Sequence, residues 1–252
     1  MAPARVEQPS VRPTVLPWEE FSEFFAETHH QGEHVAIVGP TGSGKSTLGL
    51  ELCKLIGERT ARDGRPERVV VFGTKPADRT LSRMGWPIVK EWPPGYAQEH
   101  VIVWPRPRGA KTAARRQARV YEAVMERIYR DRRAEPWTIY LDEIADFEDP
   151  PAKNGFGLAG VVAQYWRAAR ALDLTLIAGT QRPRNVGRGM WSEPTWVCVF
   201  RIEDEDDFKR VRQLGDSAAF ESIHNRLGGH EFVCVHRPRG GERSYYVSRV
   251  GS

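Results

Sequence analysis

The chain of 252 residues carries 40% hydrophobic and 28% charged residues, a balance typical of a globular protein. No apolar run approaches the roughly 18 residues that a membrane-spanning helix needs, so no membrane span is expected. The formal net charge of +4 is too small to identify a nucleic-acid-binding protein by itself. Three widely spaced cysteines, Cys53, Cys198 and Cys234, argue against a disulfide framework. We therefore expect a cytoplasmic protein.

Residues 1–30 are predicted to form a flexible arm and a short helix. Four prolines within residues 1–18 disfavour regular structure, and this stretch lacks the apolar segment of a signal peptide. Residues 18–27 have the amphipathic pattern of a short helix. Residues 31–252 are predicted to form one domain, with C-terminal β elements from about residue 195.

From residue 34 onward, compact apolar runs alternate with helical patterns. Strands are predicted at residues 34–39, 68–73, 100–104, 137–141, 174–179, 196–200, 231–236 and 245–250. Helices are predicted at residues 46–57, 112–132, 158–171 and 208–214, and residues 80–98 are predicted to form an ordered loop interrupted by prolines. This alternation predicts an α/β fold with a mostly parallel central sheet and helices on both faces.

The first chemical motif is a glycine-rich loop between a predicted strand and a predicted helix. It satisfies the P-loop (Walker A) pattern G-x-x-x-x-G-K-[ST], in which backbone N–H groups converge on phosphates and the helix N-terminus adds its positive dipole end. Lys45 is predicted to bridge the β- and γ-phosphates of ATP, and Ser46 to ligate Mg²⁺. The predicted ATP-binding residues are Gly39, Pro40, Thr41, Gly42, Ser43, Gly44, Lys45, Ser46 and Thr47.

The second motif is a pair of acids, Asp142 and Glu143, at the end of the predicted strand 137–141. A carboxylate at the strand tip can hold Mg²⁺, and a second one can polarise the water that attacks the γ-phosphate. Asp142 is predicted to serve the metal and Glu143 to act as the catalytic base. Strands often end in acidic turns, so this interpretation depends on the P-loop upstream.

A third motif follows the strand 174–179, where the chain reads Thr180-Gln181-Arg182-Pro183. The carboxyl ends of parallel strands form the ligand crevice of an open α/β sheet. Gln181 is therefore predicted to contact the γ-phosphate or the attacking water. A capped turn before Pro183 is the alternative.

Together, residues 39–47, 138–143 and 168–183 resemble the FtsK/HerA superfamily of ring-forming ATPases that pump DNA. In FtsK-like translocases, an arginine-bearing helix leads into a strand that ends in T-Q-R-P, as it does here. The similarity covers residues 34–202. It implies a RecA-like (ASCE) P-loop core, ATP and Mg²⁺ as cofactors, and a homo-oligomeric ring, pentamer or hexamer, around double-stranded DNA.

The resemblance also implies an arginine finger that acts on the neighbouring subunit's γ-phosphate. By its distance to Gln181, Arg170 matches this finger, and Arg167, one turn earlier, is the competing residue. Such fingers accelerate related phosphoryl transfers by up to about 10³ to 10⁵. The alternative for either arginine is a solvated helix residue.

DNA contacts of a pump must be made to phosphates, because every sequence has to be accepted. Ten basic and three acidic residues lie between positions 105 and 133, so this block holds a large positive excess. Residues 149–157, directly after the acidic pair, are predicted to form a flexible loop. The candidates, in order, are Lys153, then Arg184 and Arg188, then Lys111 and Arg115.

The compact length resembles the packaging ATPases of tailed phages, which implies a role at the portal of a procapsid in the host cytoplasm. Two alternatives remain open at this stage. One is an FtsK/HerA-like ATPase of plasmid transfer or chromosome processing. The other is a nucleotide-driven assembly switch, which Glu143 disfavours because a switch has less need of a water-polarising acid.

Overall fold

The computed structural model describes residues 12–60, 64–91, 99–105, 110–130, 136–153, 155–214 and 217–251. The strands are β1 (Thr14–Val15), β2 (Val35–Val38), β3 (Arg68–Phe72), β4 (Ile88–Val89), β5 (His100–Val103), β6 (Trp137–Leu141), β7 (Thr175–Thr180), β8 (Trp196–Phe200), β9 (Glu231–His236) and β10 (Ser244–Arg249). The α-helices are α1 (Trp18–Thr28), α2 (Lys45–Gly57), α3 (Arg79–Ser82), α4 (Ala110–Arg130), α5 (Ile144–Glu148), α6 (Ala159–Ala168), α7 (Gly189–Ser192), α8 (Glu205–Val211) and α9 (Ser217–His224). The 3₁₀ helices are η1 (Pro151–Lys153), η2 (Ala169–Leu172), η3 (Pro183–Asn185) and η4 (Arg212–Leu214).

All these strands join one sheet in the order β1-β10-β9-β8-β2-β7-β6-β3-β5-β4. The run from β8 to β4 is parallel, and β9 and β10 add an antiparallel extension. Strand β7 separates β2, which leads into the glycine-rich loop, from β6, which leads into the acidic pair. The predicted α/β fold with a mostly parallel sheet is confirmed, in the strand order of a RecA-like (ASCE) core.

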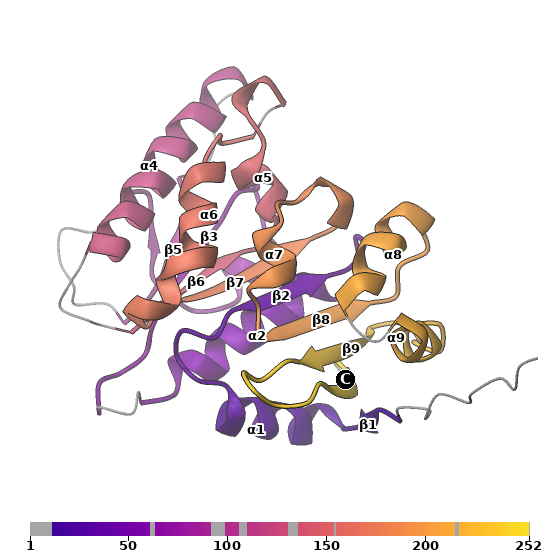
Figure 1. Ribbon diagram of the computed structural model, residues 1–252. Helices are drawn as coiled ribbons and strands as arrows, with labels where there is room; N and C mark the ends of the chain where they lie inside the picture. Colours follow the sequence, from indigo (N-terminus) through magenta and orange to yellow (C-terminus); the bar gives the residue numbers. More distant parts are fainter. Residues whose placement is uncertain are drawn as a thin grey trace, which may run out of the picture.

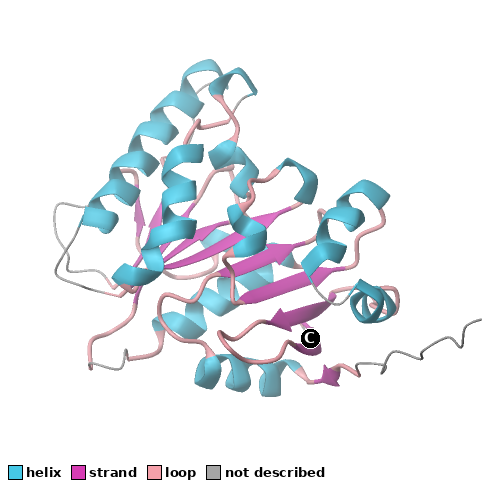
Figure 2. Ribbon diagram, viewed as in Figure 1, coloured by secondary structure: helices cyan, strands magenta, loops and turns pink. Residues whose placement is uncertain are grey.

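Helices cover both faces of the sheet (Figures 1 and 2). On one face, α1, α2 and α3 pack against side chains such as Ile37 and Val71. On the other face, α4 to α9 pack against the alternate side chains, among them Val38 and Phe72. The central strands are buried on both faces, which explains why their sequences are continuous apolar runs and not alternating ones.

The segment before the first helix lies on the sheet from its first described residues. Strand β1 runs parallel to β10, and the N–H of Leu16 donates to the carbonyl of Val247. Helix α1 then buries Phe21 and Phe25 completely or nearly so. Among the described residues, no helix is both long and apolar enough to cross a membrane.

The segment predicted as a flexible loop at residues 149–157 follows helix α5 and contains the short 3₁₀ helix η1. Its flexibility stays a prediction. Within this segment, Phe156 is buried in the core. The N–H groups of Phe156 and Gly157 donate to the carbonyls of Asp146 and Asp149 at 2.7 and 2.8 Å. The short helix α9 and strand β4 were not predicted, because segments of this length carry little periodicity.

The close packing of α2 on β6 depends on Gly49. A Cβ atom at this position would lie 2.5 Å from the ring and hydroxyl atoms of Tyr140. The glycine therefore lets the first turns of α2 approach the strand that carries the acidic pair.

We predict that Gly49→Ala lowers the free energy of unfolding by about 1–3 kcal/mol, because the added methyl group displaces Tyr140. The matched control is Gly160→Ala in α6, where a Cβ would meet nothing within 4 Å. This control is expected to gain about 0.5–1 kcal/mol from the higher helix propensity of alanine. Urea unfolding measures both values, and shifts of the two variants in the same direction would contradict the packing argument.

Candidate active site

The glycine-rich loop turns sharply from β2 into α2. Gly42 and Gly44 have φ angles of +81° and +106°, a backbone region that favours glycine. A Cβ at Gly39 would lie 2.9 Å from the Cβ of Phe200, so the loop also needs glycine where it packs on β8. The loop thereby places the N-terminus of α2 at the carboxyl edge of the sheet, as the P-loop motif predicts.

The carboxylate of Asp142 lies between two lysines at this edge. Lys45 donates to the Asp142 carbonyl at 2.7 Å and to Oδ1 at 3.1 Å. Lys75 donates to Oδ2 at 2.8 Å. Tyr140, two residues earlier on β6, donates its hydroxyl to Oδ1 at 2.8 Å. These contacts connect the ends of β6 and β3 with the start of α2.

Burial alone would raise the pKa of Asp142, but the two lysines reverse this effect. The charges of Lys45 and Lys75, with hydrogen bonds from Lys75 and Ser46, hold the pKa of Asp142 well below its usual range. The carboxylate is therefore ionised at any physiological pH. It is available as a hard oxygen donor beside the hydroxyl of Ser46.

Lys75 was not predicted as a residue of this site. It lies just past the end of β3, and nothing local in the sequence marks it as a site residue. Its place at the site follows from the pairing of β3 with β6, which brings the ends of both strands together. Lys75 could have been predicted as a site residue only from the order of the strands in the sheet.

Glu143 and Gln181 lie together, as the prediction of a shared site requires. Thr180 donates its hydroxyl to Oε1 of Glu143 at 2.8 Å, and the backbone N–H of Gln181 donates to Oε2 at 2.9 Å. The side-chain oxygen of Gln181 accepts a hydrogen bond from Thr41 in the glycine-rich loop at 2.8 Å. Gln181 thus joins the tip of β7 to the loop.

The pKa of Glu143 is raised. Burial is the main cause, and the charge of Lys45 and the hydrogen bond from Thr180 oppose it only in part. A carboxylate with a raised pKa is a stronger base, which suits a group that takes a proton from water. The pKa values of these two neighbouring acids are therefore shifted in opposite directions.

A cavity of ≈ 400 Å³ lies over the glycine-rich loop, lined among others by Gly42, Lys45, Ser46, Thr47, Lys75 and Gln181. Its size lies within the range of roughly 300–1,000 Å³ found for small-molecule sites. The hydroxyl of Ser43 in the loop is buried and has no hydrogen-bond partner within the described residues. The size of this cavity and its position over the glycine-rich loop fit a nucleotide phosphate chain.

The oxygens of Ser46 and Asp142 fit Mg²⁺, which takes oxygen ligands and is usually held by one or two carboxylates together with substrate phosphates. The described residues contain no cluster of three or more His, Cys, Asp or Glu side chains that could hold a metal without such help. Ser46 and Asp142 are therefore the residues that would hold a cation bound together with a nucleotide.

The C-terminal end of the chain packs against the glycine-rich loop. Nδ1 of His230 lies 3.1 Å from the carbonyl oxygen of Ser43, and Val250 lies where a Cβ at Gly44 would meet its methyl group. His230 itself has a positive φ of 61°. The antiparallel extension β9–β10 therefore supports the loop, a role that the sequence did not indicate.

Comparison with solved structures adds to this geometry, whereas no family profile and no curated protein sequence matches the chain. The genome packaging NTPase B204 from Sulfolobus turreted icosahedral virus 2, solved with AMPPCP, matches with a TM-score of 0.62 at 13% identity. The match covers 86% of this chain and 97% of B204. The chain shares the fold of this packaging NTPase.

Two further solved structures share this fold. The cytoplasmic domain of the type VII secretion ATPase EccC from Thermomonospora curvata matches with a TM-score of 0.56 at 17% identity, over 86% of this chain and 25% of that one. The pCW3 conjugation coupling protein TcpA, solved with ATPγS, matches with a TM-score of 0.54 at 13% identity, over 96% of this chain and 72% of that one.

Arg170 lies at the opposite edge of this fold from its own P-loop. Its carbonyl and Cγ approach Gly32, whose N–H donates to the hydroxyl of Thr175 at the start of β7. The P-loop lies beyond the far end of the neighbouring strand, roughly 16 Å away along five residues of β7. Arg167 is exposed, and its guanidinium donates within its own helix to the carbonyl of Ala163 and the side-chain oxygen of Gln164, both at 3.3 Å.

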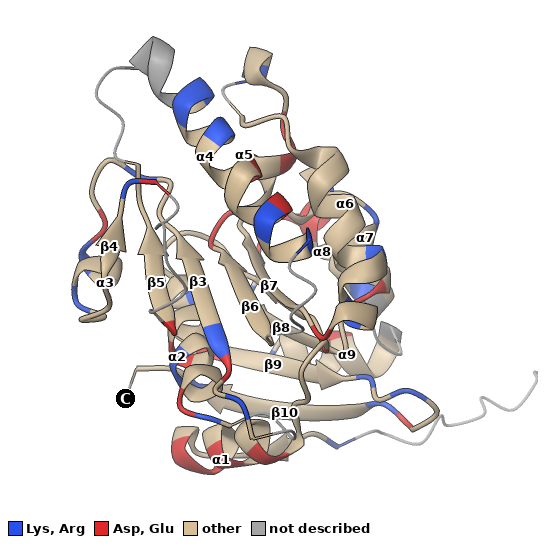
Figure 3. Cartoon of the chain, turned by 90° about the vertical axis from the view of Figure 1, so that its left-hand side faces the viewer, with Lys and Arg blue, Asp and Glu red and all other residues tan. Residues whose placement is uncertain are grey.

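The predicted DNA-contact residues lie on several surface elements. Lys153 in η1 is exposed and 3.8 Å from Asp149, Arg184 in η3 is 3.8 Å from Asp206, and Arg188 is exposed before α7. Arg115 is exposed on α4, whose basic residues Figure 3 shows, and Lys111 belongs to the same helix. The side chain of Lys111 and residues 106, 108, 132 and 133 of the basic block lie outside the described part.

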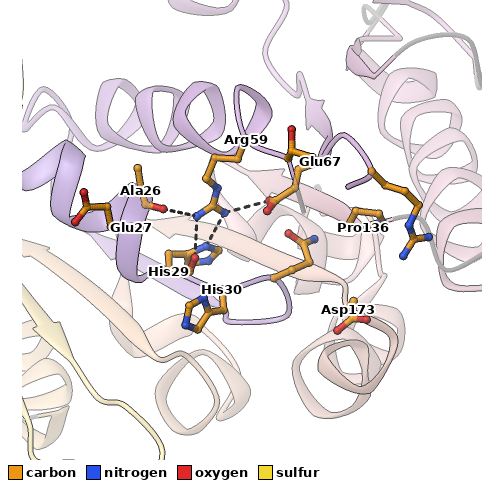
Figure 4. Close-up of a pocket in the computed structure, with 11 residues that line it drawn as sticks. Ala26, Glu27, His29, His30, Arg59, Glu67, Pro136 and Asp173 are labelled. Atoms are coloured by element: carbon orange, nitrogen blue, oxygen red, sulfur yellow. Dashed lines mark hydrogen bonds and ion pairs between the residues drawn. The ribbon is translucent and has the colours of Figure 1, made fainter. Parts of the chain in front are cut away.

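A second cavity, of ≈ 420 Å³, lies at the amino ends of the strands (Figure 4). There Arg59 donates to the carbonyls of Ala26 and His29 at 3.2 and 2.8 Å and to Glu67 at 3.1 Å. Burial, together with the charge of Arg59, lowers the pKa of His29 to about 3, so its ring is neutral. Arg59 thereby ties the ends of α1 and α2 to the start of β3, away from the P-loop.

We predict that Asp142→Asn lowers the free energy of unfolding at neutral pH by about 3 kcal/mol, because it leaves Lys45 buried without an anionic partner. Since the pKa of Asp142 is lower in the folded protein than in the unfolded chain, its contribution is present above the ordinary pKa of Asp, near 3.9. The difference from the wild type should stay constant between about pH 8 and pH 5 and shrink as the pH falls further.

Urea unfolding across this pH range measures the effect. The control is Asp206→Asn, which removes exposed ion pairs with Arg184 and Lys209 and should cost little at any pH. A difference for Asp142→Asn that grows toward acid pH would refute the assignment.

Proposed function

We propose that the chain is an ATPase that works as a homo-oligomeric ring and translocates double-stranded DNA, with viral genome packaging as its role. The observation that carries the proposal is that a P-loop lies beside the oriented, basic carboxylate of Glu143. A module that binds a nucleotide without hydrolysing it needs a P-loop but no such carboxylate. The match to almost the whole of a genome packaging NTPase supports packaging as the role.

In the proposed reaction, Lys45 and the backbone N–H groups of the P-loop bind the β- and γ-phosphates, and Ser46 and Asp142 hold Mg²⁺. The bound cation would neutralise charge that develops on the phosphates. Glu143, oriented by Thr180 and the Gln181 N–H, takes the proton of the attacking water. Gln181 exchanges its hydrogen bond with Thr41 for one to the γ-phosphate or the water.

The position of Arg170 supports a ring. Because it cannot reach its own P-loop, it can act only on the nucleotide of a neighbouring copy. A cavity of ≈ 630 Å³ adjoins the P-loop on the side of β8 and is lined by Gln181 and by the acidic residues Glu203, Asp204 and Asp207. This acidic rim favours the approach of a guanidinium group. We propose that the finger of the neighbouring subunit enters there.

A plasmid-transfer ATPase is the second candidate, and the match to the conjugation coupling protein TcpA favours it. Both candidates share the motor and differ in the partner that recruits it. Pulldown with a portal protein or with a relaxase separates them.

We predict that long double-stranded DNA stimulates steady-state ATP hydrolysis and that the stimulation fades as salt rises, because phosphate contacts release counterions. Glu143→Gln should retain ATP but lose turnover by at least about 100-fold, since it removes the base. A coupled assay of phosphate release and a nucleotide-binding assay measure the two properties. Turnover that ignores DNA at every salt concentration would argue against a DNA motor.

We also predict that Arg170→Ala keeps nucleotide binding and loses turnover by about 10³-fold, as removal of a trans-acting finger does. Mixing it with Lys45→Ala should restore part of the activity, because the intact P-loop of the first variant then meets the intact finger of the second. Arg167→Ala is the matched control and should hydrolyse ATP like the wild type. If the mixture stays inactive while both variants assemble, Arg170 is not a trans-acting finger.

A further inference from the structure

Lys75 is the one lysine of the site for which the P-loop motif offers no role. Its Nζ lies 2.8 Å from Oδ2 of Asp142 and 3.7 Å from Asp78, and its side chain lines the same cavity as Ser46, Thr47 and Gln181. The side chain is 46% exposed, whereas that of Lys45 is 4% exposed. The side chain of Lys75 can therefore change its position, whereas that of Lys45 is held by its surroundings.

The charges at Asp142 are unequal, with one carboxylate facing two ammonium groups. Lys45 has a second partner that does not change with charge, the Asp142 carbonyl at 2.7 Å. Lys75 relies on Oδ2 of Asp142, which is also the carboxylate oxygen not contacted by Lys45 or Tyr140. Lys75 thus occupies a position on Asp142 that suits a metal cation.

We propose that Lys75 is a second phosphate-binding lysine that exchanges partners when the nucleotide binds. Without nucleotide it neutralises Asp142; with Mg²⁺·ATP, Asp142 turns to the cation and Lys75 moves to the adjacent γ-phosphate. The inference rests on the proposed ATP-binding function and adds a residue to its site. The γ-phosphate is the proposed partner, because a cation held by Asp142 would contact the nucleotide phosphates and an ammonium group displaced from Asp142 would then lie beside them.

The surroundings of Lys75 allow this exchange without loss of the site. Asp142 keeps its hydrogen bond from Tyr140 after Lys75 leaves, so its orientation persists. Asp78 is fixed, because its carboxylate caps α3 by accepting the N–H groups of Thr80 and Leu81. The ion pair of Lys75 with Asp78, at 3.7 Å, is therefore weak and does not compete with a phosphate for the lysine. Lys75 can therefore move between Asp142 and the phosphate at low cost.

The test compares equilibrium binding of Mg²⁺·ATPγS and Mg²⁺·ADP to the wild type and to Lys75→Met. Loss of a charge-assisted contact to the γ-phosphate should weaken ATPγS binding about tenfold and leave ADP binding within about threefold. Lys75→Arg should recover most of the loss. The Mg²⁺ concentration at half-maximal ADP binding should fall in Lys75→Met, because Asp142 has lost a competing cation.

The matched control is Lys54→Met, which removes a lysine of similar exposure paired with Glu51 on α2 and should change neither affinity. Equal weakening of ATPγS and ADP, or no weakening of either, would overturn the γ-phosphate contact. An unchanged Mg²⁺ midpoint would overturn the exchange. If the wild type itself binds neither nucleotide, the proposed ATPase function fails as well, so the two failures are distinguishable.

Discussion

The ion pairs of Asp142 with Lys45 and Lys75 are the interaction on which the candidate site depends. They join three elements that are distant in the sequence, the P-loop helix α2 and the ends of β6 and β3. An unpaired buried charge is costly, so the three elements stabilise one another only while all are in place. Gly49 permits the close approach of α2 to β6 beside Tyr140, whose hydroxyl donates a further hydrogen bond to Asp142.

From this centre, hydrogen bonds lead outward to surface elements. Glu143 accepts from Thr180 and Gln181 on one side, and helix α5 follows it directly. At the end of α5, Glu148 accepts from the N–H of Gly187 at 2.7 Å. A change at Glu143 can therefore reach the segment that holds Arg184 and Arg188 through rigid, connected elements. In the proposed motor, this connection would couple the nucleotide state to the segment that holds these two predicted DNA-contact residues.

The two edges of the sheet carry different parts of the proposed machinery. The carboxyl edge holds the P-loop, both acids and Gln181, and the amino edge holds Arg170 and the cavity around Arg59. A single chain thus has a nucleotide site and a candidate finger that face away from each other. The candidate finger can reach a nucleotide only if the amino edge of one copy packs against the carboxyl edge of the next. The proposed activity therefore depends on the proposed ring.

The sequence by itself determined the central strands, the P-loop and the acidic pair, because these depend on local patterns: buried apolar runs, glycines at positive φ and acids at a strand end. It could not place Lys75, His230 or Tyr140 at the site, since each arrives there through strand order or helix packing. It indicated a loop at residues 149–157 but not the burial of the Phe156 side chain there, because that burial depends on contacts with distant segments. Tertiary structure decided these points because contacts between distant segments leave no local signal.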